Sequence, residues 1–148
     1  MERMDYTALS KTYNIDMQIP DSAATATALL CGHKAKFMTA GLPGDAVFSD
    51  CEGVSQHYID LMASDESDSS KTSSESILIK SAKSGKATGL VTTTRLTHAT
   101  PSAAYAHTAN RWWEMYAPAP CVSIAEQFIA KSHFFNVTFA GGAKLGRK

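Results

Sequence analysis

The chain has 148 residues, of which 44% are hydrophobic and 19% charged, an ordinary globular mix for a single domain. Fourteen basic residues balance fourteen acidic ones, so no overall field attracts nucleic acid or an anionic membrane, and we expect no nucleic-acid partner. The longest uncharged apolar run, near residues 23–31, is far shorter than the roughly 20 residues of a membrane span. The charged start lacks the apolar core of a signal peptide, so none is expected.

A strand, a helix and a solvated insertion are expected in the first half. Residues 6–13 alternate and are rich in β-prone side chains, which favours a strand. After Pro20, an alanine- and threonine-rich run predicts a helix over residues 22–31, with Gly32 in the position that commonly ends a helix. Residues 63–76 are serine-rich and mostly acidic, which indicates a flexible insertion that buries no apolar surface.

Helices and strands are expected to alternate in the second half. Residues 76–95 predict a helix, a turn at Gly85 and a strand over residues 89–94, and residues 121–142 repeat this order with a strand over residues 135–140. The second helix would present one apolar face, made of Ile124, Ala125, Phe128 and Ile129. Such alternation indicates an α/β fold with a largely parallel sheet, whose ligands gather beyond the carboxyl ends of its strands.

Three cysteines, Cys31, Cys51 and Cys121, allow one disulfide in three possible pairings. No Cys-x-x-Cys pair or zinc-finger spacing occurs, which argues against a structural zinc site. Cys31 lies in the small-residue helix and is expected to be a buried thiol, which leaves Cys51 and Cys121 as the favoured pair. On composition alone, two reduced cysteines are an equally good alternative.

The start of the first helix carries two polar residues that allow two interpretations. Asp21 and Ser22 follow Pro20 and precede the small residues, a helix N-cap signal worth about 1 kcal/mol. A helix N-terminus also offers free N–H groups and a partial positive charge to a phosphate. The cap is the better interpretation from these residues alone. Ser22 can also occupy the cap while acting as a nucleophile.

A second polar segment, residues 92–114, follows the predicted strand. His98 and Thr100 are two residues apart, so in an extended backbone their side chains would point the same way. Arg111 could offer two N–H donors to two oxygens of a phosphate. The alternative is a surface loop whose histidines make local hydrogen bonds. The two tryptophans after Arg111 are expected to pack rather than bind.

Two blocks, ALSKTYNIDMQIPDSAATATALLCG and VTTTRLTHATPSAAYAHTANRWW, occur in this order. Together they resemble the alkaline phosphatase family, particularly its animal branch, over about residues 8–142, with residues 63–76 as the exception. The resemblance implies that residues 1–148 form a partial domain, part of a largely parallel three-layer α/β sandwich truncated at both ends. It also implies hydrolysis of phosphate monoesters through a phosphoserine intermediate, with two zinc ions and one magnesium ion.

The resemblance assigns roles to five positions. Ser22 matches the nucleophilic serine, which also contacts a zinc ion, and Arg111 matches the phosphate-binding arginine. Asp21 matches the residue that orients this arginine. Thr100 matches a serine or threonine ligand of magnesium, and His98 matches a residue beside the magnesium site.

The cysteines match the animal members as well: Cys51 and Cys121 correspond to a disulfide pair, and Cys31 to an unpaired cysteine. Other parts of the family pattern have no counterpart. The family's Asp-Gly-Met-Gly segment, whose aspartate bridges zinc and magnesium, does not occur in this sequence, and most zinc ligands would lie outside this chain. Enzymes of this class supply accelerations approaching ~10²¹, roughly 28 kcal/mol, whereas one charge-assisted contact supplies ~2–4 kcal/mol. We therefore expect this chain alone to be nearly inactive.

An alternative function is that of a non-catalytic truncated homologue or partial gene product, acting, if at all, as a binding or assembly module. For the full-length protein, the resemblance implies phosphate monoesters as substrates, a homodimer, and an extracellular or cell-surface location. Membrane attachment would come through a lipid anchor whose signal is absent from this chain. A piece of a larger sheet would expose strand edges and helix faces, which favours aggregation.

Overall fold

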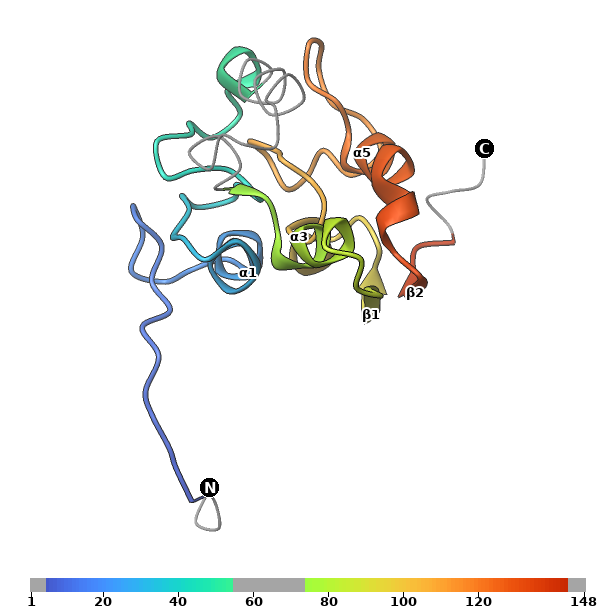
Figure 1. Cartoon of the computed structure of the whole chain (residues 1–148). Helices are drawn as coiled ribbons and strands as arrows, with labels where there is room; N and C mark the ends of the chain where they lie inside the picture. Colours follow the sequence, from blue (N-terminus) through green and yellow to red (C-terminus); the bar gives the residue numbers. More distant parts are fainter. Residues whose placement is uncertain (1–4, 55–73, 144–148) are drawn as a thin grey trace.

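The structure is a computed structural model that describes residues 5–54 and 74–143. Figure 1 shows an N-terminal arm that projects away from the body of the molecule, in which strands β1 (Gly89–Arg95) and β2 (Val137–Gly141) lie side by side. The helical elements are α1 (Ser22–Cys31), α3 (Ile77–Lys83), α4 (Ala99–Ser102), α5 (Ile124–Lys131) and the 3₁₀ helix η2 (Ser132–Phe134). The predicted order of helices and strands in the second half is thus confirmed.

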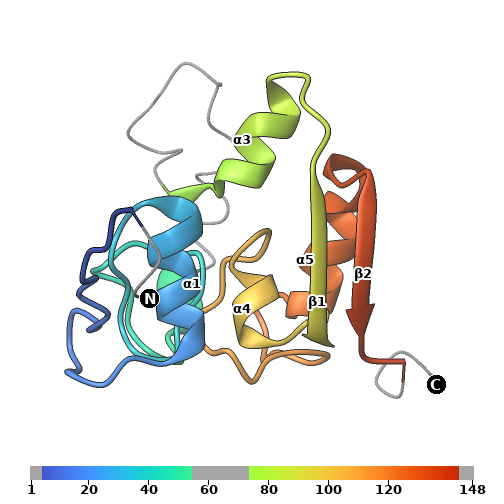
Figure 2. The same ribbon diagram turned by 90° about the horizontal axis from the view of Figure 1, so that it is seen from below.

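The two strands pair in parallel, as predicted for helix–strand alternation. Gly89 lies opposite Val137 and Val91 opposite Phe139. β2 begins later than predicted, because the chain leaves α5 through η2 and Phe135 turns into the core first. Figure 2 shows α5 packed along the sheet, with α1, α3 and α4 on the side of β1 away from β2.

The core lies between these helices and one face of the sheet. Tyr105 is buried at its centre and makes edge-to-face contacts with Phe128 and Phe135. The opposite face is open in the described residues: Val91 is 74% exposed and Phe139 67%. Because parallel sheets are normally covered on both faces, this apolar face favours association between molecules.

Helix α1 has the predicted bounds because both ends are defined by local chemistry. The Asp21 carboxylate accepts hydrogen bonds from the Ala23 and Ala24 N–H groups, so Asp21 is the N-cap. Ser22 is the first helical residue, which corrects the expectation that Ser22 itself could occupy the cap. Gly32 ends the helix in the left-handed conformation, with φ of 82°.

Helix α5 buries part of the predicted face, since Ile124 and Phe128 contact the core. Ile124 is fully buried, but Ile129 is 72% exposed, and the polar Gln127 is buried instead. The reason is hydrogen bonding: Gln127 Nε2 donates to the His107 carbonyl at 3.1 Å, and Gln127 Oε1 accepts from the His107 N–H at 2.8 Å. The Gln127 side chain thus makes the two hydrogen bonds to the His107 backbone that a neighbouring strand would make in a sheet.

The strand predicted over residues 6–13 is wrong. These residues form an exposed arm without regular structure, in which Tyr6 and Leu9 are almost completely exposed. A β-strand needs a neighbour for its N–H and C=O groups, and none of the described segments pairs with the arm. At the end of the arm, the Lys34 ammonium group donates hydrogen bonds to the carbonyls of Lys11 and Tyr13 in place of a neighbouring strand.

Cys51 and Cys121 form a disulfide, which confirms the favoured pairing. Cys31 is a free thiol that is partly rather than fully buried, and its burial raises its pKa to about 11.

Most of the predicted insertion, residues 63–73, lies outside the described residues. Its end is packed rather than solvated, since Ser74 and Ser76 are buried. None of the helices in the described parts is long and apolar enough to cross a membrane.

Candidate functional site

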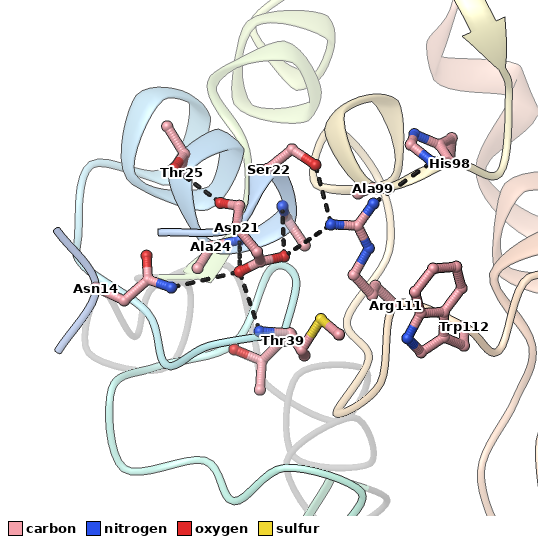
Figure 3. Close-up of polar contacts among 12 residues, drawn as sticks. Asn14, Asp21, Ser22, Ala24, Thr25, Thr39, His98, Ala99, Arg111 and Trp112 are labelled. Carbon is pink, nitrogen blue, oxygen red and sulfur yellow. Dashed lines mark hydrogen bonds and ion pairs between the residues drawn. The ribbon is translucent and has the colours of Figure 1, made fainter. Parts of the chain in front are cut away.

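Asp21 lies at the centre of a hydrogen-bond network at the N-terminus of α1 (Figure 3). Its side chain is only 6% exposed, and its two oxygens accept from five donors. The donors are the N–H groups of Ala23, Ala24 and Met38, the amide of Asn14 and the guanidinium of Arg111. A carboxylate saturated in this way can hold an arginine in place, but it has no oxygen left to act as a base.

Arg111 and Ser22 meet beside this carboxylate, although they are far apart in the sequence. Arg111 Nη1 donates to Asp21 Oδ2 at 3.1 Å and to Ser22 Oγ at 3.0 Å. The Arg111 side chain is 12% exposed, whereas Ser22 is exposed to solvent. The arrangement places an exposed serine hydroxyl beside a guanidinium group, which is suited to binding an anion such as phosphate.

His98 and Thr100 do not have the predicted relation. The strand ends at Arg95, His98 is the N-cap of α4, and Thr100 is helical and exposed. Their side chains are therefore not on one side of an extended segment. His98 does reach the site: its Nε2 lies 3.4 Å from Arg111 Nη2. Burial and the nearby positive charges of Arg111 and Arg95 lower the pKa of His98.

The two tryptophans differ in environment. Trp113 packs against the core cluster that contains Leu42, Val54 and Ala109, as predicted. Trp112 is 59% exposed, which contradicts its predicted packing. Its ring lies beside the Arg111 guanidinium, whose central carbon is 5.3 Å from the ring centre (Figure 3). This cation–π contact is a further restraint on the Arg111 guanidinium besides the carboxylate network.

A second ion pair anchors the far end of the segment that carries Arg111. Glu114 is largely buried and binds Arg95 through two hydrogen bonds, with Nε at 2.9 Å and Nη2 at 2.5 Å. The Thr97 hydroxyl donates to the same carboxylate at 2.6 Å. The Arg95 hydrogen bond contributes most to lowering the pKa of Glu114 below its ordinary value of 4.5. Glu114 is thus predicted to stabilise the fold as a charged group.

Replacing Glu114 with glutamine is expected to lower the free energy of unfolding by about 2 kcal/mol at neutral pH. Because the folded pKa lies below the unfolded value, this contribution is present above pH 4.5 and is lost as the pH falls through the folded pKa. Urea unfolding at neutral and at acidic pH measures the difference. Asp5→Asn, which removes an exposed carboxylate from the arm, is the control for net charge. A pH-independent difference between Glu114→Gln and the native chain would contradict the expectation.

Three positioning contacts could not be read from the sequence. Thr27 Oγ1 accepts the Gly41 N–H at 2.9 Å, Ala40 forms an antiparallel bridge with Thr108, and the Met38 carbonyl accepts the Arg111 N–H at 2.9 Å. They join α1 to the segment before Arg111. The sequence gives one signal in this region, a glycine at position 41, and nothing that identifies its partner.

The described residues do not by themselves make a zinc or magnesium site. Zinc is held by three or four histidine, cysteine or carboxylate ligands, and magnesium by oxygens that usually include a carboxylate. Within residues 5–54 and 74–143, no group of three or more such side chains gathers. The Asp21 carboxylate is fully used by N–H donors, and Ser22 and Thr100 offer neutral hydroxyls.

Comparison with known proteins places these observations in a family. Residues 1–146 match the family model described as alkaline phosphatase. The tissue-nonspecific alkaline phosphatase isozymes of Gallus gallus and Homo sapiens are 41% and 39% identical to the chain over 151 aligned residues. Each alignment covers 97% of the chain and 26% of the relative, so the chain spans about a quarter of the length of these relatives.

Solved structures agree with the sequence relatives. The alkaline phosphatase from the Antarctic bacterium TAB5 has a TM-score of 0.50 and 30% identity, covering 69% of this chain and 23% of that chain. A mutant of the same enzyme with magnesium bound in its M3 site has a TM-score of 0.50 and 29% identity, covering 69% and 22%. Since the family model matches nearly the whole sequence and the parallel α/β arrangement is shared, this chain belongs to the alkaline phosphatase family.

Proposed function

We propose that this chain carries the nucleophile and the phosphate-binding arginine of a phosphomonoesterase. The observation that supports this most is the contact of Arg111 Nη1 with both Ser22 Oγ, at 3.0 Å, and the buried Asp21 carboxylate, at 3.1 Å. An exposed serine hydroxyl beside a held guanidinium places a nucleophile next to the group that would bind the phosphate oxygens. Family membership supports the same reaction.

In the proposed reaction, the phosphoryl group of a monoester lies between Ser22 and Arg111. A bond forms between Ser22 Oγ and phosphorus while the bond from phosphorus to the alcohol oxygen breaks, and the serine proton ends on the released alcohol. Water then attacks the phosphoserine, restoring the serine hydroxyl and releasing inorganic phosphate. Arg111 stabilises the negative charge on the phosphoryl oxygens in both steps. Asp21 keeps Arg111 in position through the contact of 3.1 Å.

The two zinc ions and one magnesium ion implied by the family resemblance would take most of their ligands from outside this chain. From this chain, Ser22 would contact a zinc ion and Thr100 the magnesium ion, with His98 beside the magnesium site. Such ions would supply charge stabilisation and activation of hydroxyl groups. We propose near-inactivity for the chain alone, since its one arginine contact falls far short of the acceleration required.

The remaining expectations from the resemblance are proposals for the full-length protein. They are a partial phosphatase domain over residues 1–148 with an insertion at residues 63–76, phosphate monoesters as substrates, and a homodimer outside the cell or at its surface. A lipid anchor would provide any membrane attachment.

The test is turnover of p-nitrophenyl phosphate at alkaline pH with zinc and magnesium present. Two proteins are compared: this chain, and the Gallus gallus enzyme in which this chain replaces the matching segment. We expect turnover by the chimera alone, reduced at least about 10³-fold by Ser22→Ala. Ser84→Ala, at the exposed end of α3, is the matched control and should leave turnover unchanged. Full activity of the Ser22→Ala chimera would refute the nucleophile, and Ser22-dependent turnover by the bare chain would refute its inactivity.

A further inference from the structure

One residue between the two functional segments contacts both through its backbone. The Met38 N–H donates to Asp21 Oδ1 at 3.0 Å, and the Met38 carbonyl accepts from the Arg111 N–H at 2.9 Å. Met38 therefore links the carboxylate that holds the Arg111 guanidinium to the backbone from which that guanidinium extends. No other described residue joins Asp21 to the Arg111 backbone in this way.

The backbone of Met38 has an uncommon conformation for a residue with a side chain. Its φ is 67°, in the left-handed region. Glycine adopts this region readily and asparagine and aspartate do so occasionally, but it is unfavourable for other residues. In a right-handed or extended conformation the N–H and C=O groups would point elsewhere, so the two hydrogen bonds could not form together. The two hydrogen bonds therefore depend on the left-handed conformation of Met38.

The surrounding loop is fixed on both sides of Met38, so the conformation is imposed on it. Before it, the Phe37 N–H donates to Asp16 Oδ1 at 2.9 Å. After it, Thr39 and Ala40 are fully buried, and Ala40 exchanges two hydrogen bonds of 2.9 Å with Thr108. Strained residues that the neighbouring structure holds in place concentrate at functional sites.

We propose that Met38 is a positioning residue, whose left-handed peptide aligns Arg111 with Asp21 so that the guanidinium faces Ser22. This inference rests on the proposed function for the identity of the ligand, phosphate. Met38 does not touch the ligand or the reacting oxygen. It acts through its backbone, so the identity of its side chain should matter only through the conformations that this side chain permits.

The experiment titrates the ¹⁵N-labelled 148-residue chain with inorganic phosphate and follows the Arg111 Nε–Hε signal by NMR. Met38→Gly and Met38→Asn permit the left-handed conformation and should bind phosphate within about twofold of the native chain. Met38→Val, whose branched side chain disfavours that conformation, should weaken binding roughly tenfold and shift the Arg111 signal before phosphate is added. Gly32→Val is the matched control, with the same backbone strain at the far end of α1 and native binding expected.

Each outcome decides a different question. If the Arg111→Ala variant binds phosphate as tightly as the native chain, the proposed function is refuted. The Met38 proposal would then be judged on the Arg111 signal without phosphate, where a native signal in Met38→Val overturns it. If phosphate binding depends on Arg111, equal binding by the valine and glycine variants overturns the Met38 proposal alone. If the Met38→Val variant does not fold, the glycine and asparagine variants test the proposal. A loss of phosphate binding in both would overturn it, because the role would then belong to the methionine side chain rather than to the backbone.

Discussion

Replacing Gly41 with alanine is expected to lower the free energy of unfolding by roughly 3–5 kcal/mol, from left-handed strain and steric overlap together. Gly41 has φ of 64°, and a Cβ atom there would lie 2.0 Å from the Ala106 carbonyl oxygen. The glycine cannot move away easily, because its N–H is bound by Thr27 Oγ1 and its carbonyl by the His107 ring. Denaturant unfolding followed by circular dichroism measures the loss.

Gly32→Ala separates the two contributions to this loss. Gly32 also has a left-handed backbone, with φ of 82°, but nothing lies within 4 Å of the position that a Cβ would take. Its replacement should cost about 1 kcal/mol, from backbone strain alone. Equal losses for Gly41→Ala and Gly32→Ala would show that the contact with Ala106 does not constrain the loop.

Replacing Asp21 with alanine is expected to lower the free energy of unfolding by about 3–5 kcal/mol. The change removes the N-cap of α1 and leaves the largely buried Arg111 guanidinium without its carboxylate. It also leaves the Met38 N–H without its acceptor. Urea unfolding of the native and substituted chains at neutral pH gives the difference.

Two other substitutions show which part of the Asp21 effect comes from charge. Asp21→Asn keeps a cap oxygen and removes the charge, so its loss should be smaller than that of alanine. Asp16→Asn is the matched control, because Asp16 also accepts a backbone N–H, from Phe37, but lies in an exposed contact without a guanidinium. A change of less than about 0.5 kcal/mol in Asp21→Ala would be typical of an ordinary surface residue and would contradict a structural role for the network.

Elements defined by neighbouring residues could be predicted from the sequence. Asp21 and Gly32 define α1 through a cap and a left-handed stop, and both signals lie within the helix and its flanks. The sequence predicts β1 to within one residue, since its apolar residues and the turn at Gly85 are local. For Asp21 and Ser22 the residues alone favour a helix cap, and their interpretation as part of a phosphate site rests on the resemblance of both sequence blocks to the family.

Features that depend on distant partners could not be predicted. The arm at residues 6–13 has the composition of a strand, but composition does not show whether a neighbouring strand exists. Gln127 takes a core position because its amide completes the hydrogen bonds of a loop 20 residues away. Met38 has no sequence signal at all, since methionine is not a residue that favours a left-handed backbone.

The uncovered face of the sheet, where Val91 and Phe139 are exposed, has a consequence for every measurement of this chain in solution. If two or more molecules bury that face together, folding and assembly are linked by mass action, and the apparent stability rises with protein concentration. A midpoint of unfolding would then describe a chosen concentration rather than the polypeptide alone. Variants should therefore be compared at one fixed protein concentration. A dilution series would measure how much of the free energy of unfolding comes from association between molecules.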